Sequence, residues 1–498
     1  MSILLLASAF AVATCGLIYE LLAGTLASYL LGDSVTQFST VIGTYLFAMG
    51  VGSWCTKYFR GDLLAHFARI EVLVGVVGGC SVLLLFWLYG HIIHFRIALY
   101  LTVFVIGALV GAEMPLLLRI QRGTLDFKDM VSRVFAADYV GALFAALLFP
   151  LWLVPMLGLV RTAFLFGLLN IAVALILLWR MAASPALWAS RAFAIVALVG
   201  LTIGFSVGDE AQSYAETAQY PGEIIYSHST PYQRIVLSAV AGDLQLFLNG
   251  NLQFSGRDEY RYHEALVHPA MRRAANPERI LILGGGDGLA AREVLKYPNV
   301  KSIQLIDLDP GVTALFKNTP WLRRLNADSL NEPRLMISNA DAFEWLHDNP
   351  RQFDVVIIDF PDPSNYSVGK LYSTSFYRRV AAVLAPGGVV VVQATSPFVA
   401  KKAYWCIVAT LEAEGFATQP YHALVPSFGD WGFVLATRFP WEAPHALPAG
   451  LRFLDEPNEA ALFVFPRDSR VDHVGVNRLN DQVLVRYFDE EWSRYLGG

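Results

Sequence analysis

The chain has few cysteines, and no two of them are closely spaced. It contains four, of which Cys15, Cys55 and Cys80 lie in apolar stretches and Cys406 lies far downstream. No Cys-X-X-Cys pair occurs, so the sequence excludes a disulfide framework and argues against a structural zinc site. We therefore expect a fold that depends on buried apolar surface, without a metal.

Charged residues are also scarce, and the scarcity is concentrated in one half. They make up 16% of the chain against 55% hydrophobic residues, with a mean hydropathy of +0.46. The first 207 residues hold 11 Lys and Arg against 8 Asp and Glu, whereas the rest hold 26 against 34. This predicts an apolar, membrane-inserted front part and a soluble, acidic back part. Because an acidic surface repels phosphate, we expect no nucleic-acid partner and a cationic substrate.

The front part contains seven apolar stretches that are long enough, or nearly so, to cross a bilayer. The first has no basic segment before it and exceeds the apolar region of a signal peptide, so we interpret it as a spanning helix. The seven stretches cover roughly residues 3–31, 37–56, 68–90, 97–118, 135–157, 162–180 and 190–207. We expect a multi-pass protein of the cell membrane.

Four carboxylates lie in or near these stretches: Glu20, Glu71, Glu113 and Asp138. A charge in hydrocarbon costs at least about 2.5 kcal/mol, so such side chains usually face the interior of a bundle. They could form a path or a site for cations, or they could simply join helices. We favour the second interpretation, because no pairing pattern identifies a transporter.

A small β-rich segment follows a polar linker that starts at Gly208. Asn249-Gly250 between alternating apolar residues is a strong hairpin signal, and a helix is expected to start near Asp258. The expected strands of this segment cover Glu223–Tyr226, Gln233–Ser238 and Leu244–Leu248.

The next segment has the rhythm of a doubly wound α/β domain. A strand at Arg279–Leu283 leads into the turn Gly284–Gly288, a helix over Leu289–Tyr297, and a strand at Ser302–Ile306 that ends in Asp307. The glycine turn lets a ligand approach the backbone, and a carboxylate about 20 residues later suits ribose hydroxyls. This pattern fits nicotinamide, flavin or adenosyl-sulfonium ligands.

Aspartates follow the later strands as well. In an open α/β sheet, ligands bind at the carboxyl ends of the strands, so the aspartates there should face one crevice. Helix caps and turns explain some single aspartates but not five at successive strand ends: Asp287, Asp307, Asp341, Asp359 and Asp362. We expect the last strand at Gly388–Val392 and a lid-like loop at Val425–Phe433.

The acidity of the crevice favours a wholly cationic ligand. The carboxylate of ordinary S-adenosylmethionine would be repelled by Asp287 beside the glycine turn. The same sulfonium without that carboxylate, which carries only a primary amine, would be held there.

At these residues the chain resembles the polyamine aminopropyltransferases, the spermidine synthase family. The resemblance runs from about Tyr232 to Phe433, and the apolar front half looks like that of the membrane-attached bacterial members. It rests on linked motifs, namely Tyr232-Gln233, Leu248-Asn249-Gly250, Tyr262-His263-Glu264, Gly284–Gly288 and Asp359–Pro363. It implies a Rossmann-like domain of the methyltransferase type, preceded by a small antiparallel sheet and a multi-pass helical membrane domain.

The resemblance also implies the reaction and the donor site. Decarboxylated S-adenosylmethionine would be the co-substrate, with no further cofactor, and a diamine, usually putrescine, would be the acceptor. Gln233 and Asp287 would hold the aminopropyl end, and Asp307 would bind the ribose. The turn glycines Gly284 and Gly286 would lie against the donor, and Asp341 with Ala342 would face the adenine.

On the acceptor side, the resemblance implies that Asp359 accepts a proton from the attacking amine, which Tyr262 helps to position. Asp362 would bind the acceptor amine, His263 fits the bacterial form of the motif, and Glu264 would support them. The chain departs from the family in having Asp307 where a glutamate is frequent, and Phe428 where many members have tyrosine. The second departure affects the choice of acceptor more than the reaction.

The expected domains are residues 1–207 (membrane), 208–275 (linker and small sheet), 276–440 (catalytic) and 441–498 (extension). The resemblance implies a homo-oligomer, a dimer or a tetramer. Basic loops, such as the one with Lys57 and Arg60, place the N-terminus in the cytoplasm. Seven crossings would then put the catalytic domain outside, but its nucleotide-derived substrate is made inside cells, so we expect a cytoplasmic catalytic domain.

Two alternatives stay open at this point. One is a methyltransferase that acts on a membrane substrate, which the apolar half would suit. The other is a polyamine transporter or sensor whose soluble part only binds ligand.

Overall fold

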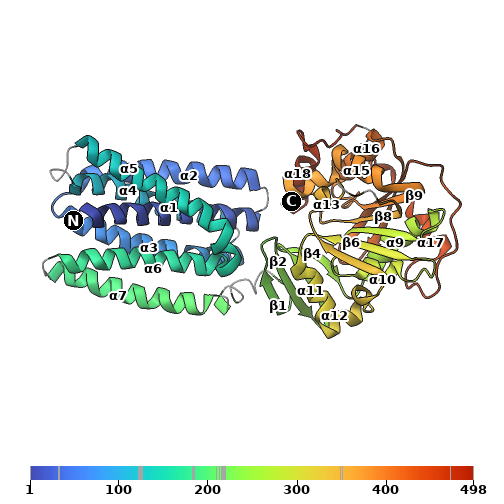
Figure 1. The fold of residues 1–498 in the computed structure, drawn as a ribbon, viewed down its shortest axis with the longest axis horizontal. Helices are drawn as coiled ribbons and strands as arrows, with labels where there is room; N and C mark the ends of the chain where they lie inside the picture. Colours follow the sequence, from blue (N-terminus) through green and yellow to red (C-terminus); the bar gives the residue numbers. More distant parts are fainter. Residues whose placement is uncertain are drawn as a thin grey trace. The chain divides into compact units, whose positions relative to one another are not determined.

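The computed structural model describes residues 2–31, 34–92, 94–121, 127–181, 185–208, 210–211, 214, 220–347, 349, 351–471 and 473–496. The chain divides into two compact units, residues 1–231 and 232–498. The first is mainly helical and the second is built on a large sheet (Figure 1). Much of the expected linker lies outside the described residues, and the expected division into four domains stays a prediction.

Within the described residues, the first unit contains seven α-helices and two short helical turns. Long apolar runs with few charges make these helices, which are α1 (Ser2–Leu31), α2 (Ser34–Cys55), η1 (Thr56–Tyr58), α3 (Leu63–Tyr89), α4 (Phe95–Gln121), α5 (Phe127–Leu148), η2 (Phe149–Leu153), α6 (Val154–Arg180) and α7 (Pro185–Ser206). In the described part of the chain, six segments are long and apolar enough to cross a membrane, if Lys128–Arg180 is counted as one. That segment is interrupted at Gly158, whose φ of 70° ends the helical path between the fifth and sixth expected stretches.

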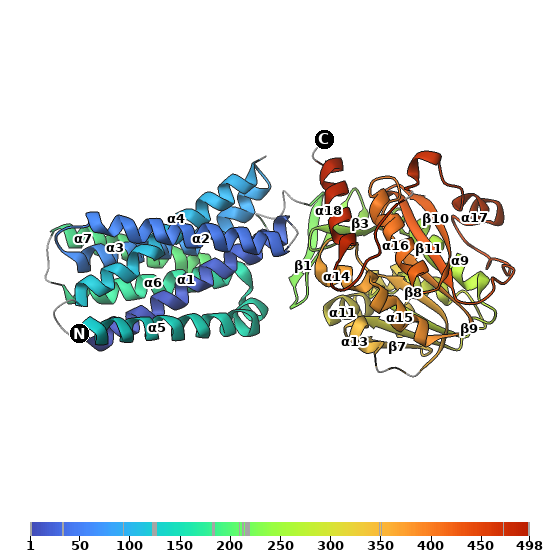
Figure 2. The ribbon, with the colours of Figure 1, turned by 90° about the horizontal axis from the view of Figure 1, so that it is seen from above.

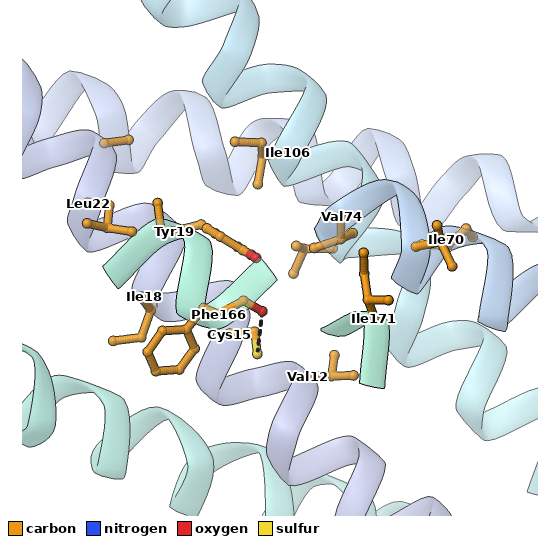
Figure 3. Packing of buried hydrophobic residues seen from close by; sticks show 14 of the residues in the cluster. Val12, Cys15, Ile18, Tyr19, Leu22, Ile70, Val74, Ile106, Phe166 and Ile171 are labelled. Carbon is orange, nitrogen blue, oxygen red and sulfur yellow. Dashed lines mark hydrogen bonds between the residues drawn. The ribbon is translucent and has the colours of Figure 1, made fainter. Parts of the chain in front are cut away.

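Close helix packing in this unit depends on glycine. A Cβ atom on Gly52 of α2 would lie 1.8 Å from the carbonyl oxygen of Ala108 on α4. Only a residue without a side chain permits this approach. Apolar side chains make most of the core: Figure 3 shows Cys15 and Tyr19 of α1 beside Phe166 of α6, with the Cys15 Sγ 3.9 Å from the Phe166 carbonyl oxygen.

The second unit begins with three antiparallel strands, β2 (Arg234–Val240), β3 (Asp243–Leu248) and β4 (Asn251–Ser255), and β1 (Glu223–Ser229) precedes them at the end of the first unit. Asn249 and Gly250 both have a positive φ, 49° and 79°. These angles allow the tight turn of a hairpin. The predicted hairpin is therefore confirmed.

The main sheet has the strand order β10-β11-β9-β8-β5-β6-β7. Five strands are parallel: β5 (Arg279–Gly284), β6 (Ser302–Asp307), β7 (Leu335–Asn339), β8 (Phe353–Asp359) and β9 (Leu384–Gln393). Their carboxyl ends consequently meet at one edge of the sheet. The Rossmann-like fold expected from the βαβ rhythm is confirmed.

Helices cover both faces of this sheet (Figures 1 and 2). Helices α9 and α10 pack together, with α9 against β8 and β9, and α15 and α16 share a core with the opposite face. The helices are α9 (Glu259–Arg273), α10 (Leu289–Val294), α11 (Pro310–Asn318), α12 (Pro320–Leu325), α13 (Ala342–Trp345), α14 (Tyr366–Gly369), α15 (Thr374–Val383), α16 (Lys401–Ala413), α17 (Glu456–Leu462) and α18 (Val483–Leu496).

The end of the sheet differs from the expectation. The sequence interpretation stopped at Gly388–Val392 and made Val425–Phe433 a lid-like loop, but two more strands follow, β10 (Ala417–Val425) and β11 (Gly429–Thr437). They pair antiparallel as a hairpin, and β11 pairs with β9. The polar sequence of β10 with Pro420 does not read as a central strand, but β10 is an edge strand, where proline is tolerated.

Candidate active site

The glycine turn after β5 brings three strand ends together. Gly284 is in register with Asp359 on β8, and a Cβ atom on Gly284 would lie 2.1 Å from the Asp359 carbonyl oxygen. A Cβ atom on Gly286 would lie 2.6 Å from a carboxylate oxygen of Asp307, at the end of β6. The turn therefore requires glycine in order to place the carboxyl groups of Asp307 and Asp359 close to one backbone segment.

Asp307 is held by backbone donors. The amide N–H of Gly286 donates to its Oδ2 at 3.0 Å, and the N–H of Asp309 donates to its Oδ1 at 2.9 Å. Burial raises the pKa of Asp307 to about 6, although these two donors oppose the rise. Each oxygen retains acceptor capacity for a ligand hydroxyl, which suits the predicted role in ribose binding.

Asp359 and Tyr262 form a direct pair. The Tyr262 hydroxyl, on α9, donates to Oδ1 of Asp359 at 2.6 Å. Burial raises the pKa of Asp359 to about 6, against the lowering effects of nearby His263 and of the Tyr262 bond. Burial and the neighbouring carboxylate raise the pKa of Tyr262, so the phenol stays protonated. This arrangement leaves the second oxygen of Asp359 available to take a proton.

Asp362 lies three residues beyond Asp359 and has different partners. The Thr395 hydroxyl donates to its Oδ2 at 3.2 Å, and the Gln393 side-chain amide approaches its Oδ1 at 3.5 Å. Burial raises the pKa of Asp362 to about 7, although both bonds lower it. A carboxyl group in this setting binds an ammonium group strongly, because little water competes with the ligand.

Asp287 faces a buried cation. His263 donates from Nδ1 to Oε2 of Glu259 at 2.9 Å, and Arg292 holds both oxygens of Glu259, at 2.8 and 2.9 Å. Burial alone would lower the pKa of His263, but the bond to Glu259 raises it above its usual value. Burial raises the pKa of Asp287, while His263 and the Leu289 N–H lower it. The imidazolium thus partly offsets the charge of the crevice.

The remaining predicted donor-site residues lie further along the strand ends. Asp341 accepts from the Phe343 N–H at 2.8 Å and pairs with the Lys370 ammonium at 2.7 Å. Lys370 thus offsets the charge of Asp341, so the strand ends carry less negative charge than the five aspartates alone would give. Ala342 is buried as the first residue of α13. The Gln233 amide donates to Oδ2 of Asp309 at 2.9 Å, close to the predicted ribose site.

The structure thus places Asp287 close enough to Asp307 and Asp359 for its charge to raise the pKa values of both. The charge of Asp362 likewise raises the pKa values of two nearby tyrosines, Tyr262 and Tyr372. The roles assigned to these residues remain predictions. Residues that the sequence interpretation did not assign also belong to the site, and most act through partners far away in the chain: Glu259, Arg292, Lys370, Tyr372, Gln393, Thr395 and Trp431.

Glu264 supports the site in a way that the motif alone does not reveal. It is fully buried, and its carboxylate accepts from the backbone N–H groups of Arg452, Phe453 and Leu454 at 2.8 to 2.9 Å. The motif helix α9 is therefore tied to the C-terminal extension across about 190 residues. No local sequence signal indicates such a bond.

The chain is similar to a known family and to several known proteins. The family described as "Spermine/spermidine synthase domain" matches residues 259–439. A polyamine aminopropyltransferase of Leptospira interrogans is 50% identical over 490 residues, which covers 98% of each chain. Polyamine aminopropyltransferase 2 of Ralstonia nicotianae is 51% identical over 503 residues and 99% of each chain. The solved spermidine synthase of Thermotoga maritima is 26% identical, with a TM-score of 0.44, and covers 49% of this chain and 85% of that one.

Proposed function

Because the chain belongs to the polyamine aminopropyltransferase family, we propose that the diamine to which it transfers the aminopropyl group of decarboxylated S-adenosylmethionine is putrescine. The products are then spermidine and methylthioadenosine. The pair Asp359 and Asp362 carries the proposal. These two carboxyl groups stand three residues apart at the end of β8, each with its own hydroxyl donor, and a small dication needs two such anchors.

In the donor site, Asp307 binds the ribose hydroxyls and Asp287 binds the primary ammonium of the donor. Ordinary S-adenosylmethionine carries a carboxylate at that end, which Asp287 repels. Lys370 neutralises Asp341, so that side of the crevice suits an uncharged adenine. The site therefore selects a donor that has no negative charge.

In the acceptor site, Asp362 binds the acceptor amine and Asp359 takes the proton that the attacking nitrogen loses. An alkylammonium has a pKa near roughly 10, so the attacking nitrogen must lose a proton to become nucleophilic. That nitrogen then bonds to the carbon attached to the sulfonium, and the carbon–sulfur electrons move to sulfur, which leaves as a neutral thioether. An ionised Asp is a weak base, so alignment by Tyr262, Asp359 and Asp362 supplies most of the rate gain.

The test uses the purified full-length protein with decarboxylated S-adenosylmethionine and a panel of diamines, with products separated by mass. Spermidine from putrescine as the main product is the expected result. Methyl transfer from intact S-adenosylmethionine would contradict the proposal and favour the methyltransferase alternative. Binding without any product would favour the transporter or sensor.

The variant Asp359→Asn sharpens this test. It is expected to keep the fold but to lower turnover about 10²-fold or more, because the proton acceptor is lost. Asp354→Asn is the matched control, since Asp354 lies on the same strand but pairs with Arg279 outside the crevice at 2.8 Å. Equal activity of the two variants would remove Asp359 from its assigned role.

We also propose that the first unit crosses the cell membrane, with the catalytic unit in the cytoplasm. Large apolar side chains are exposed along its helices, including Phe47, Leu101, Leu143, Leu151 and Val196, and such a surface is stable in lipid rather than in water. A cysteine introduced as Glu442→Cys in a background without native cysteines should react with an impermeant reagent only after cells are opened. Labelling in intact cells would show the opposite orientation, with the catalytic unit outside the cytoplasm.

A homo-oligomer is the expected assembly, to be checked by the mass of the protein in its detergent complex.

A further inference from the structure

The C-terminal extension reaches the acceptor side of the active site. This extension, residues 441–498, lies beyond the matched family domain, which ends at residue 439. Its last helix, α18, packs against α14 and α16, and Glu491 on α18 accepts from the N–H groups of Lys402 and Ala403 at the start of α16. Figure 2 shows α18 beside both helices. The extension is thus a fixed part of the second unit.

One side chain of α18 bonds to a partner of Asp362. The indole N–H of Trp492 donates to the Thr395 hydroxyl at 3.4 Å, and that hydroxyl donates to Asp362 at 3.2 Å. The direction of this chain is fixed, because an indole nitrogen can only donate. Thr395 must therefore accept from Trp492 and point its single proton at the carboxylate. Hydrogen bonds in such a chain strengthen one another.

The backbone at Thr395 indicates that this placement is functional. Thr395 is fully buried with a φ of 50°, and it is the only β-branched residue with a positive φ in the described part of the chain. Such a conformation costs free energy and persists only where the surroundings enforce it. Here the Gly432 N–H donates to the Thr395 carbonyl oxygen at 2.7 Å. Such contacts keep the Thr395 hydroxyl beside Asp362 in spite of the backbone strain.

We infer that Trp492 is a positioning residue for the acceptor amine, which acts through the Thr395 hydroxyl on the carboxylate of Asp362. The inference rests on the proposed role of Asp362 in binding the acceptor. It gives the extension a part in the affinity for primary alkylammonium substrates. Ring contacts with Phe488 and Tyr495, both at 5.9 Å between centroids, hold the indole in place.

The experiment compares Trp492→Phe with Trp405→Phe in the full-length enzyme. Both variants keep an aromatic ring and lose one indole N–H. Trp405 lies on α16 and donates at 2.7 Å to the carbonyl oxygen of Ser469, which belongs to the extension. This bond does not involve Asp362. Trp492→Phe should raise the KM for putrescine by roughly 3- to 10-fold, with a much smaller change in the KM for the donor, the scale of one hydrogen bond. An equal effect of both variants would overturn the inference.

A second pair tests the link without Trp492. Thr395→Val keeps the branched shape but loses the hydroxyl, and should raise the KM for putrescine about 10-fold or more, whereas Thr395→Ser should restore it to near the wild-type value. The acid limb of kcat/KM for putrescine should move to higher pH in Trp492→Phe and Thr395→Val. The tyrosines that face Asp362, Tyr262 and Tyr372, stay protonated there because burial raises their pKa values.

The proposed roles of Asp362 and of Trp492 can be overturned separately. Asp362→Asn should raise the KM for putrescine more than any of these variants. If it does not, the proposed role of Asp362 is wrong. If it does, while Trp492→Phe leaves the KM and the pH profile of the wild type, only the role of Trp492 is overturned.

Discussion

The two units treat buried glutamates in opposite ways. In the catalytic unit, Glu264 accepts three backbone N–H bonds, and Glu293 accepts from His268 and Arg292. In the helical unit, Glu71 and Glu113 are just as buried, but none of their four oxygen atoms has a hydrogen-bond partner among the described residues. A buried ionised carboxylate is tolerated only where donors surround it. The same Glu→Gln substitution should therefore have opposite consequences in the two units.

The largest effect is expected for Glu264→Gln. A glutamine side chain keeps one acceptor oxygen and puts an NH₂ group where the other oxygen stood, so at least one of the three N–H donors loses its acceptor and faces another donor. We expect a local loss of about 3 kcal/mol, the scale of broken charged hydrogen bonds in a buried site. Hydrogen exchange of the Arg452–Leu454 amides measures it directly. Glu442→Gln, on the exposed part of the extension, is the control, and equal protection in both variants would contradict the comparison.

This difference between carboxylates marks what the sequence could and could not predict. The turn at Gly284–Gly288, the strand ends at Asp307 and Asp359, and the hairpin at Asn249-Gly250 follow from local rules about glycine, strand length and turn residues. Lys370 beside Asp341, or Thr395 beside Asp362, are contacts between segments about 30 residues apart. Only tertiary packing decides them, so no local spacing could have identified them.

An intermediate effect concerns pH and separates the active-site carboxyl groups, Asp359 and Asp362, from the buried glutamates Glu259 and Glu293. Burial raises the pKa of Asp359 to about 6 and of Asp362 to about 7. Burial also opposes ionisation of Glu259 and Glu293, but bonds from His263 and His268, together with those from basic side chains, lower their pKa values to about 2. Activity with putrescine should therefore fall as pH drops from 8 through 7 and 6, while Glu259 and Glu293 keep their charge.

Stability should respond in the other direction over that range. Because the pKa values of Asp359 and Asp362 are raised, the folded state binds more protons than the unfolded state between about pH 4 and 7. These two groups therefore favour folding more as pH falls. Glu259 and Glu293 contribute stability above about pH 4.5 that is lost only toward pH 2. Melting temperatures and kcat/KM measured across pH 5 to 8 test whether activity falls while the stability of the folded state rises. A parallel fall of activity and melting temperature would show that acid simply unfolds the protein.

The smallest effect is expected for Glu113→Gln in the helical unit. Glu113 on α4 and Glu71 on α3 interact electrostatically with each other, and no salt bridge reaches either of them within the described residues. The amide has nearly the shape of the carboxyl group and can form a hydrogen bond to Glu71, so the substitution breaks no salt bridge and relieves any repulsion between like charges. Aminopropyl transfer should be unchanged, and the melting temperature of the detergent-solubilised protein should stay the same or rise by a few degrees. A large fall in melting temperature would mean that the glutamate binds something outside the chain. A small cation is the ligand that two unpartnered carboxyl groups would accept, and repeating the melt with added sodium or putrescine, in wild type and variant, would then identify it.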